Sequence, residues 1–199
     1  MIGLIDYGAG NLHSINRALK YLGYKTHLIS SPNDLNRVEK LIIPGVGSFG
    51  PAIRELKKKN LVSLIKHWIN HSRPLLGICL GLQLLTEGSE ESPANQGFCH
   101  FSGKCQRLKA KKVPHIGWNE VKIIRADPIF SGLIEPIYFY FVHSYAFVDH
   151  SNSTIAVTEY EYTFSSVLRK GSVYACQFHP EKSGETGLLF LKNWVEQCC

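Results

Sequence analysis

Two short segments, far apart in the chain, carry residues whose types and spacing suit covalent chemistry. In GICLGLQLL at 77–85, Cys79 follows an apolar stretch and has a glycine two residues away on either side. In YACQFHPEKSG at 174–184, His179 ends another apolar stretch, and Glu181 comes two residues later. A thiol, an imidazole and a carboxylate are the nucleophile, base and orienting group of a cysteine hydrolase.

The glycine spacing around Cys79 is that of a nucleophile elbow, a tight turn between a strand and a helix. Gly77 and Gly81 would let the backbone turn without side-chain clashes, so that the thiol stands exposed above the sheet edge. The N–H of Leu80 can then help to bind an oxyanion, and the start of the following helix favours a thiolate. The alternative is a packing cysteine in an ordinary turn, which the motif alone leaves open.

The choice of His179 among nine histidines depends on its place at the end of a strand. Reactive groups gather at the carboxyl ends of strands in an open parallel sheet, where we also expect Cys79. Pro180 stiffens the turn, and Glu181 can bend back to the imidazole. The alternatives are a surface turn histidine and a solvated carboxylate.

The elements that must position these residues follow from apolar periodicity. Strands are predicted at 2–6, 25–29, 40–44 and 74–78, with helices over 11–22, from about Pro51 and from about Leu61. This alternation predicts βαβ units and a parallel sheet. Short β-type segments between Gly103 and Phe178, including 137–148, predict added antiparallel strands, with a hairpin turn at 169–172. A final helix is expected over about 185–197, and the whole chain 1–199 as a single domain.

Composition indicates an ordinary globular protein, with 44% hydrophobic and 19% charged residues. The N-terminus has no basic region before its apolar run, and no apolar stretch reaches the roughly 18 residues of a membrane span. We therefore expect a cytoplasmic protein without a membrane partner. The net charge of +6 comes partly from clusters at 54–59 and 107–112. These lack stacking aromatics, so solvated faces are favoured over a nucleic-acid site, with attraction of an anionic partner as the alternative.

Other patterns are weaker. The six cysteines form no CxxC pair, so we expect reduced thiols and no zinc site, with the adjacent Cys198 and Cys199 exposed. His67 and His71 have metal-ligand spacing on a helix but no third ligand in view. GAGN at 8–11 lacks the third glycine of a dinucleotide-binding motif, since position 13 is histidine.

GICLGLQLL together with QFHPEKSG resembles the class I, triad-type glutamine amidotransferases. The further segments IDYGAGN (5–11), PGVGSFG (44–50), KVPHIGWNEV (112–121) and YFVHSYAF (140–147) resemble the branch that supplies ammonia to imidazole glycerol phosphate synthases. The resemblance covers nearly the whole chain. It implies an α/β, flavodoxin-like fold with a mixed, mainly parallel sheet flanked by helices.

The resemblance also implies the roles of particular residues. Cys79, His179 and Glu181 would be a triad that hydrolyses the side-chain amide of L-glutamine. The backbone N–H groups of Val46 and Leu80 would hold the oxyanion. Glutamine binding would fall to Gly47, Gln83, Ser144 and Tyr145. The residues facing the synthase subunit would be Asn11, Trp118 and Ser183. No metal or organic cofactor is implied.

The implied partner is a (β/α)8-barrel cyclase, bound as a heterodimer, that uses the ammonia to form imidazole glycerol phosphate.

Two segments depart from the family pattern. Residues 90–108 match loosely, and Glu161 stands where glycine is expected. A paralogue feeding another synthase, for example in sugar amidation, therefore remains an alternative. A related cysteine peptidase is disfavoured because glutamate, Glu181, follows His-Pro as in the family's glutaminases. A catalytically silent interaction subunit is disfavoured because all three triad residues are present.

Overall fold

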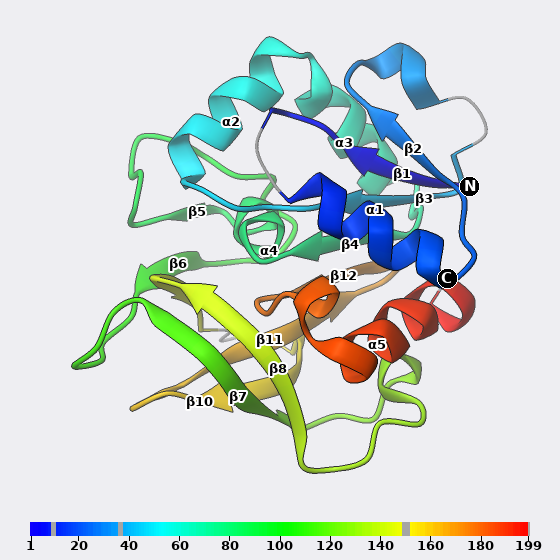
Figure 1. The fold of residues 1–199 in the computed structure, drawn as a ribbon. Coiled ribbons are helices and arrows are strands. Elements are labelled where there is room, and N and C mark those ends of the chain that lie inside the picture. The colour runs from blue at the N-terminus through cyan, green and yellow to red at the C-terminus, as the bar shows by residue number, and fades with distance from the viewer. Residues whose placement is uncertain (9–10, 36–37, 149–151, 199) are drawn as a thin grey trace.

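The computed structural model of the chain describes residues 1–8, 11–35, 38–148 and 152–198. Within these ranges the strands form a nine-stranded sheet with the order β2-β1-β3-β4-β12-β11-β10-β7-β8. A second, three-stranded sheet has the order β5-β6-β9. Figure 1 shows the large sheet running through the molecule with helices above and below it.

Half of the large sheet is parallel. Its strands are β1 (Ile2–Ile5), β2 (Thr26–Ile29), β3 (Lys40–Ile43), β4 (Leu75–Ile78) and β12 (Val173–Cys176). Every neighbouring pair among them is parallel. The four N-terminal strands confirm the predicted βαβ segments. The fifth comes from the far end of the chain, and its pairing sets Cys176 opposite Ile78.

The other half of the sheet is antiparallel. Its strands are β7 (His115–Ile123), β8 (Ile137–His143), β10 (Thr154–Glu159) and β11 (Thr163–Lys170). The pairs β11–β12, β10–β11, β7–β10 and β7–β8 are all antiparallel. This confirms the predicted antiparallel extension. The predicted hairpin turn joins β11 to β12, with Gly171 at φ 61°.

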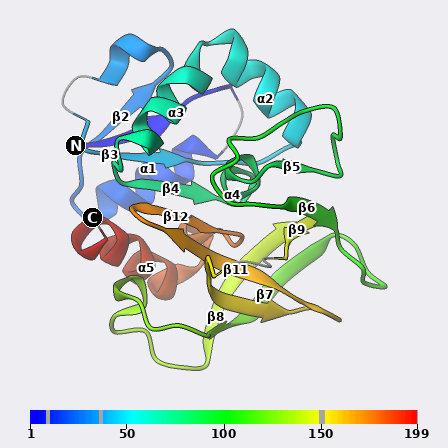
Figure 2. The same cartoon turned by 180° about the vertical axis from the view of Figure 1, so that it is seen from behind.

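Helices cover both faces of the sheet. On one face lie α1 (Leu12–Tyr21) and α5 (Gly184–Gln197), whose buried side chains join one apolar core. On the other lie α2 (Phe49–Lys58), α3 (Leu61–Asn70) and the short α4 (Leu80–Leu85), which share a second core. Figures 1 and 2 show these two layers from opposite sides. Single turns of 3-10 helix occur at Pro32–Leu35, Pro128–Phe130 and Pro180–Lys182.

The small sheet was not predicted. It contains β5 (Gly88–Ser89), β6 (Lys104–Arg107) and β9 (Tyr145–Phe147). Residues 137–148 were expected as one β-type segment, but the chain leaves the large sheet after His143 and joins the small one at Tyr145. Ser144 is therefore a corner between two sheets. Apolar periodicity cannot reveal a corner, because the residues on both sides of it are buried.

Cys198 and Glu161 each bear on an expectation from the sequence. Cys198 was expected to be exposed, but its side chain lies in the core under α5 and the residue is 2% exposed. That prediction is wrong for Cys198, and Cys199 lies outside the described residues. Glu161 has φ 58°, in the turn between β10 and β11. This left-handed conformation is the physical reason to expect glycine there.

The remaining expectations concern membranes and metals. In the described part of the chain no helix has the length and apolarity needed to cross a membrane. The rings of His67 and His71 lie tilted against each other, with centroids 4.0 Å apart. No cluster of three or more His, Cys, Asp or Glu side chains within the described ranges is arranged to hold a metal ion.

Candidate active site

Cys79 occupies the sharp turn between β4 and α4. Its backbone has φ 53° and ψ −105°, a conformation that residues other than glycine rarely adopt. Hydrogen bonds hold it on both sides. The Cys79 N–H donates to the carbonyl of Cys176 at 2.7 Å, and the Cys79 carbonyl accepts from the N–H of Leu82 at 3.0 Å. The turn therefore has the strained geometry expected of a nucleophile elbow.

The glycines around Cys79 are required because backbone segments approach closely. A Cβ on Gly81 would lie 2.0 Å from the carbonyl oxygen of Ile43, and a Cβ on Gly77 would lie 2.7 Å from the carbonyl oxygen of Gly81. A Cβ on Gly45 would lie 2.4 Å from Cβ of Leu80. Since Gly45 belongs to the PGVG segment after β3, that segment packs directly against the elbow.

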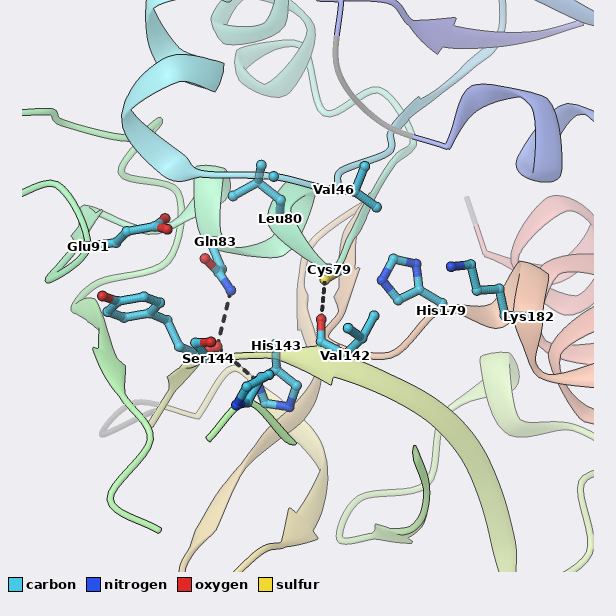
Figure 3. A pocket seen from close by; sticks show the side chains of 13 residues that line it. Val46, Cys79, Leu80, Gln83, Glu91, Val142, His143, Ser144, His179 and Lys182 are labelled. Carbon is cyan, nitrogen blue, oxygen red and sulfur yellow. Dashed lines mark hydrogen bonds between the residues drawn. The ribbon is translucent and has the colours of Figure 1, made fainter. Parts of the chain in front are cut away.

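His179 and Glu181 follow β12, the strand that pairs with β4. Nδ1 of His179 lies 2.8 Å from Oε1 of Glu181, and both side chains are 1% exposed. Nε2 of His179 has no hydrogen-bond partner among the described residues. Figure 3 shows the imidazole of His179 beside the sulfur of Cys79. The tertiary structure thus brings the three predicted triad residues into one site, with Nε2 left to serve the thiol.

The charge state of His179 depends on its two neighbours. Burial by itself lowers the pKa of the imidazole, but the interactions with Cys79 and Glu181 outweigh it and raise the pKa to about 10. The sulfur of Cys79 makes two weak contacts, with the carbonyl oxygen of Val142 at 3.8 Å and with Nε2 of Gln177 at 3.6 Å. The interactions with Cys79 and Glu181 thus favour the protonated form of His179 beside the sulfur.

A cavity of about 380 Å³ opens beside the sulfur of Cys79. This volume lies within the range of small-molecule sites. All seven residues expected at the oxyanion and glutamine sites and at the nucleophile line it: Val46, Gly47, Cys79, Leu80, Gln83, Ser144 and Tyr145. His179 lines it as well, and Figure 3 shows these side chains arranged around the cavity.

A buried tyrosine anchors the start of the PGVG segment. The hydroxyl of Tyr7 donates to the carbonyl of Pro44 at 2.8 Å, and Tyr7 is fully buried. Gly47 has φ 100°, a value open to glycine but strained for other residues. The segment after β3 is therefore anchored at Pro44, and at Gly47 it lines the same cavity as Cys79.

Two charged residues in the cavity were missed by the sequence analysis. Glu91 lines it, and its Oε2 accepts a hydrogen bond from the N–H of Phe49 at 2.7 Å. Lys182 also lines it, with Nζ 5.9 Å from the ring centre of Tyr140. Glu91 belongs to the loosely matching segment 90–108, and neither residue stands in a spacing that singles it out.

The segment around Ser144 forms the opposite wall. Nε2 of Gln83 donates to the carbonyl of Tyr145 at 3.1 Å, which ties α4 to the corner between the two sheets. The carbonyl of Ser144 accepts from the N–H of Leu108 at 2.9 Å. The predicted substrate-binding residues on α4 and on the corner are thus joined by hydrogen bonds.

The three residues expected at a partner surface lie in different environments. Trp118 on β7 is 57% exposed. Asn11 caps α1, with its side-chain oxygen accepting from the N–H of Ser14 at 3.3 Å. Ser183 is 2% exposed; its hydroxyl donates to the carbonyl of His179 and accepts from the N–H of Tyr140. Ser183 therefore ties the His179 turn to β8, and its expected place toward the synthase subunit stays a prediction.

Comparison with known proteins identifies the family. Residues 3–198 match the model of the family described as glutamine amidotransferase class-I. The imidazole glycerol phosphate synthase subunit HisH of Caldanaerobacter subterraneus subsp. tengcongensis is 47% identical over 98% of both chains. The protein of the same name from Thermococcus kodakarensis is 44% identical, again over 98% of both chains. These relatives are named as one component of a synthase.

Solved structures agree on the fold. A crystal structure of a glutamine amidotransferase superposes with a TM-score of 0.77 at 18% identity, over 98% of both chains. The structure of PurLQS from Thermotoga maritima superposes with a TM-score of 0.75 at 17% identity, over 98% of this chain and 96% of that one. These structures support the amidotransferase fold with its mixed sheet flanked by helices.

Proposed function

The chain belongs to the class I glutamine amidotransferases, and we propose on that premise that it hydrolyses L-glutamine and delivers the ammonia to a synthase partner. The observation that carries this proposal is the meeting of Cys79, His179 and Glu181 beside a cavity of about 380 Å³. A strained cysteine with an adjacent imidazolium is the arrangement of a cysteine acyl-transfer enzyme. We treat residues 1–199 as one glutaminase domain.

The first half of the proposed cycle forms a thioester. The thiolate of Cys79 attacks the carboxamide carbon, and the backbone N–H groups of Val46 and Leu80 bind the oxyanion. The imidazolium of His179 donates its Nε2 proton to the nitrogen as the C–N bond breaks, which releases ammonia. Glu181 holds Nδ1 throughout, so that Nε2 stays directed at the reacting atoms.

The second half hydrolyses the thioester. Once Cys79 is acylated it carries no negative charge, so one of the causes that raise the pKa of His179 disappears. Burial then favours the neutral imidazole, which can take a proton from water as the water attacks the carbonyl carbon. The C–S bond breaks, glutamate leaves, and the thiolate and imidazolium form again. The same pair of residues thus serves as acid and then as base.

Recognition of glutamine is assigned to the walls of the cavity. We place the α-ammonium group at Glu91, a carboxylate that lines the cavity. The backbone around Ser144 and Tyr145 and the adaptable Gly47 would hold the remaining polar atoms. Gln83 supports the Tyr145 carbonyl and completes this wall. A contact between the carboxylate of Glu91 and the α-ammonium would hold glutamine by its amino-acid end and leave its side-chain amide free to approach Cys79.

The partner we propose is a (β/α)8-barrel cyclase, bound as a heterodimer. The relatives are named as subunits of imidazole glycerol phosphate synthase. The cyclase would use the ammonia to cleave a phosphoribulosyl formimino-aminoimidazole carboxamide ribotide, giving imidazole glycerol phosphate and an aminoimidazole carboxamide ribotide for histidine biosynthesis. Five described cysteines are free thiols, in keeping with a reducing compartment, and we place the complex in the cytoplasm.

A docking face for this partner is offered by the outer surface of β7 and β8. Trp118 is 57% exposed there, Ile116 and Tyr138 are also exposed, and the Trp118 ring contacts Tyr140 edge to face. Exposed aromatic and aliphatic side chains gathered on a sheet face favour a protein contact. Asn11 is assigned to the same interface, at the start of α1.

The experiment is glutamine hydrolysis by the purified chain, alone and with the histidine-pathway cyclase of its own host together with the cyclase ligand. We expect weak activity alone, strong stimulation in the complex, and formation of imidazole glycerol phosphate. Absence of glutamate formation under both conditions would overturn the glutaminase assignment. Stimulation by a different synthase, without imidazole glycerol phosphate, would favour the paralogue.

A further inference from the structure

Two buried histidines outside the triad form a chain of hydrogen bonds next to the cavity. His115 is 3% exposed and His143 is 6% exposed. Nδ1 of His115 lies 3.0 Å from Nε2 of His143, and Nδ1 of His143 lies 2.9 Å from the carbonyl oxygen of Tyr145. At the other end, Nδ2 of Asn119 lies 3.3 Å from Nε2 of His115.

The partners at the two ends determine where the protons are. The Tyr145 carbonyl can only accept, so Nδ1 of His143 carries a proton and its Nε2 accepts in the neutral ring. Nδ1 of His115 must then donate to that Nε2, which leaves Nε2 of His115 to accept from Asn119. Every bond therefore runs in one direction, from Asn119 to Tyr145. A second proton on His143 would break its bond to His115, and one on His115 would oppose the Asn119 amide.

Packing holds both rings in this arrangement. The ring of His115 stacks between Phe141 and Tyr160, with centroids 5.0 and 4.0 Å away. The ring of His143 meets Phe164 edge to face at 5.1 Å. Burial lowers the pKa of His115 to about 4 and that of His143 to about 3, with His115 and His179 adding to the shift of His143. Both rings are thus neutral at physiological pH.

The chain ends at the corner that forms one wall of the cavity. The Tyr145 carbonyl accepts from His143 and also from Gln83, so two donors hold its direction. His143 ends β8, Tyr145 begins β9, and the bond between them spans Ser144. The Tyr145 carbonyl belongs to the peptide between Tyr145 and Ala146, and the bond from His143 closes over Ser144. Holding this carbonyl therefore fixes the backbone of the corner, where Ser144 and Tyr145 line the cavity.

We propose that His115 and His143 are positioning residues for glutamine binding. Acting as a neutral, one-directional relay, they fix the backbone of the corner at Ser144 and Tyr145, and His115 acts entirely through His143. This inference rests on the proposed glutaminase function and deepens it. It assigns the affinity for glutamine partly to a residue that does not line the cavity, since His115 is absent from the cavity wall.

Two variants of His143 separate the relay from general packing. His143→Asn keeps a donor near the position of Nδ1, so the bond to the Tyr145 carbonyl can persist. His143→Gln keeps a polar group near the position of Nε2, so the contact with His115 persists and the bond to Tyr145 is lost. We expect His143→Gln to raise KM for L-glutamine about tenfold, with kcat changed by less than about threefold, and His143→Asn to restore most of the KM.

His115→Phe tests action at a distance. The phenyl ring keeps the stacking on Phe141 and Tyr160 but cannot donate to His143. We expect KM to rise about fivefold to tenfold, again with little change in kcat. The measurements use the full chain in complex with the cyclase, and a lowered thermal midpoint identifies any variant that is merely destabilised.

A readout independent of activity is the nitrogen NMR of the histidine rings in the full chain. We expect both rings to be neutral and protonated at Nδ1 between pH 6 and 8, as in the hydrogen-bond chain. An Nε2-protonated His143, or equal KM for wild type, His143→Gln and His115→Phe, would overturn the relay. A wild-type chain without glutaminase activity would instead overturn the proposed function, and the tautomers would still test the relay.

Discussion

Nδ1 of His179 lies 2.8 Å from Oε1 of Glu181, in a turn where both side chains are 1% exposed. Oε2 of Glu181 has no hydrogen-bond partner among the described residues. Burying a carboxylate that has only one hydrogen bond costs free energy, and the positive charge of the His179 imidazolium offsets that cost. This relationship explains why the imidazole keeps one orientation, and after the larger effect of Cys79 it helps to raise the pKa of His179 above its ordinary value.

Replacing Glu181 by glutamine removes the charge and keeps the size. We expect kcat to fall by roughly 10²- to 10⁴-fold, because the amide can hold the imidazole in the wrong tautomer. The pKa of His179 should fall, so the imidazolium would be lost at lower pH. The pH profile of Cys79 alkylation by iodoacetamide measures this shift. Glu185→Gln, on the exposed start of α5, is the matched control, and an equal effect there would contradict the assignment.

Replacing Cys79 by alanine should abolish glutamine hydrolysis, with a loss of at least about 10³-fold, because Cys79 supplies the one thiol among the described residues that line the cavity. The control is Cys99→Ala, since Cys99 is exposed and outside the cavity. Glutamate release is measured with the cyclase present. Full activity in Cys79→Ala would contradict the thioester mechanism.

Replacing Glu91 by glutamine keeps an acceptor for the Phe49 N–H but removes the negative charge. We expect KM for glutamine to rise by about 10- to 100-fold, because a charge-assisted contact with the α-ammonium is lost. The matched test uses 4-carbamoylbutanoate, which has the same amide but no amino group. Wild type and Glu91→Gln should hydrolyse it equally. A larger loss on this analogue than on glutamine would place Glu91 elsewhere in the reaction.

Replacing Trp118 by alanine should weaken binding of the cyclase by about 30-fold, as expected for an aromatic anchor worth about 2 kcal/mol at an interface. The isolated chain should keep its stability and its basal glutaminase activity, because Trp118 is 57% exposed and does not line the cavity. Binding is measured by titration calorimetry. Ile134→Ala removes an even more exposed apolar side chain as control. Equal affinity of wild type and Trp118→Ala would remove this face from the interface.

The two relay histidines should make the fold sensitive to acid. Their pKa values, about 4 for His115 and about 3 for His143, lie below the ordinary value, so the unfolded chain binds more protons as the pH falls. Their contribution to the free energy of unfolding is complete above about pH 6.5 and is lost as the pH falls toward 4. The free energy of unfolding then changes by at most about 2.7 kcal/mol per pH unit, because two protons are bound. His179, whose pKa is raised, adds nothing to this window.

Urea unfolding between pH 4 and 7 measures that slope. His115→Phe removes one of the two titrating rings and should reduce the slope by about half. An unchanged slope in this variant would mean that His115 is protonated in the folded protein.

Local sequence determined a large part of this protein. Gly77 and Gly81 predicted the elbow because only glycine tolerates the approach of neighbouring backbone, and the structure places a carbonyl oxygen where a Cβ would be. Alternating apolar segments predicted four of the five parallel strands and the helices on them, whereas β12 lay in the region expected to add antiparallel strands. The order Cys, His, Glu and the further motifs indicated the family, which the similarity over residues 3–198 confirms.

Tertiary structure decided what local patterns cannot contain. Glu91 enters the cavity from a segment with no recognisable spacing, and the corner at Ser144 exists because consecutive strands join different sheets. Cys198 is buried by elements distant in sequence, so its exposure could not be judged from its neighbours. Cys79 and His179 meet because β12 returns from the end of the chain to pair with β4. The sequence indicated the candidate reacting groups, and long-range pairing of strands placed Cys79 and His179 at one cavity.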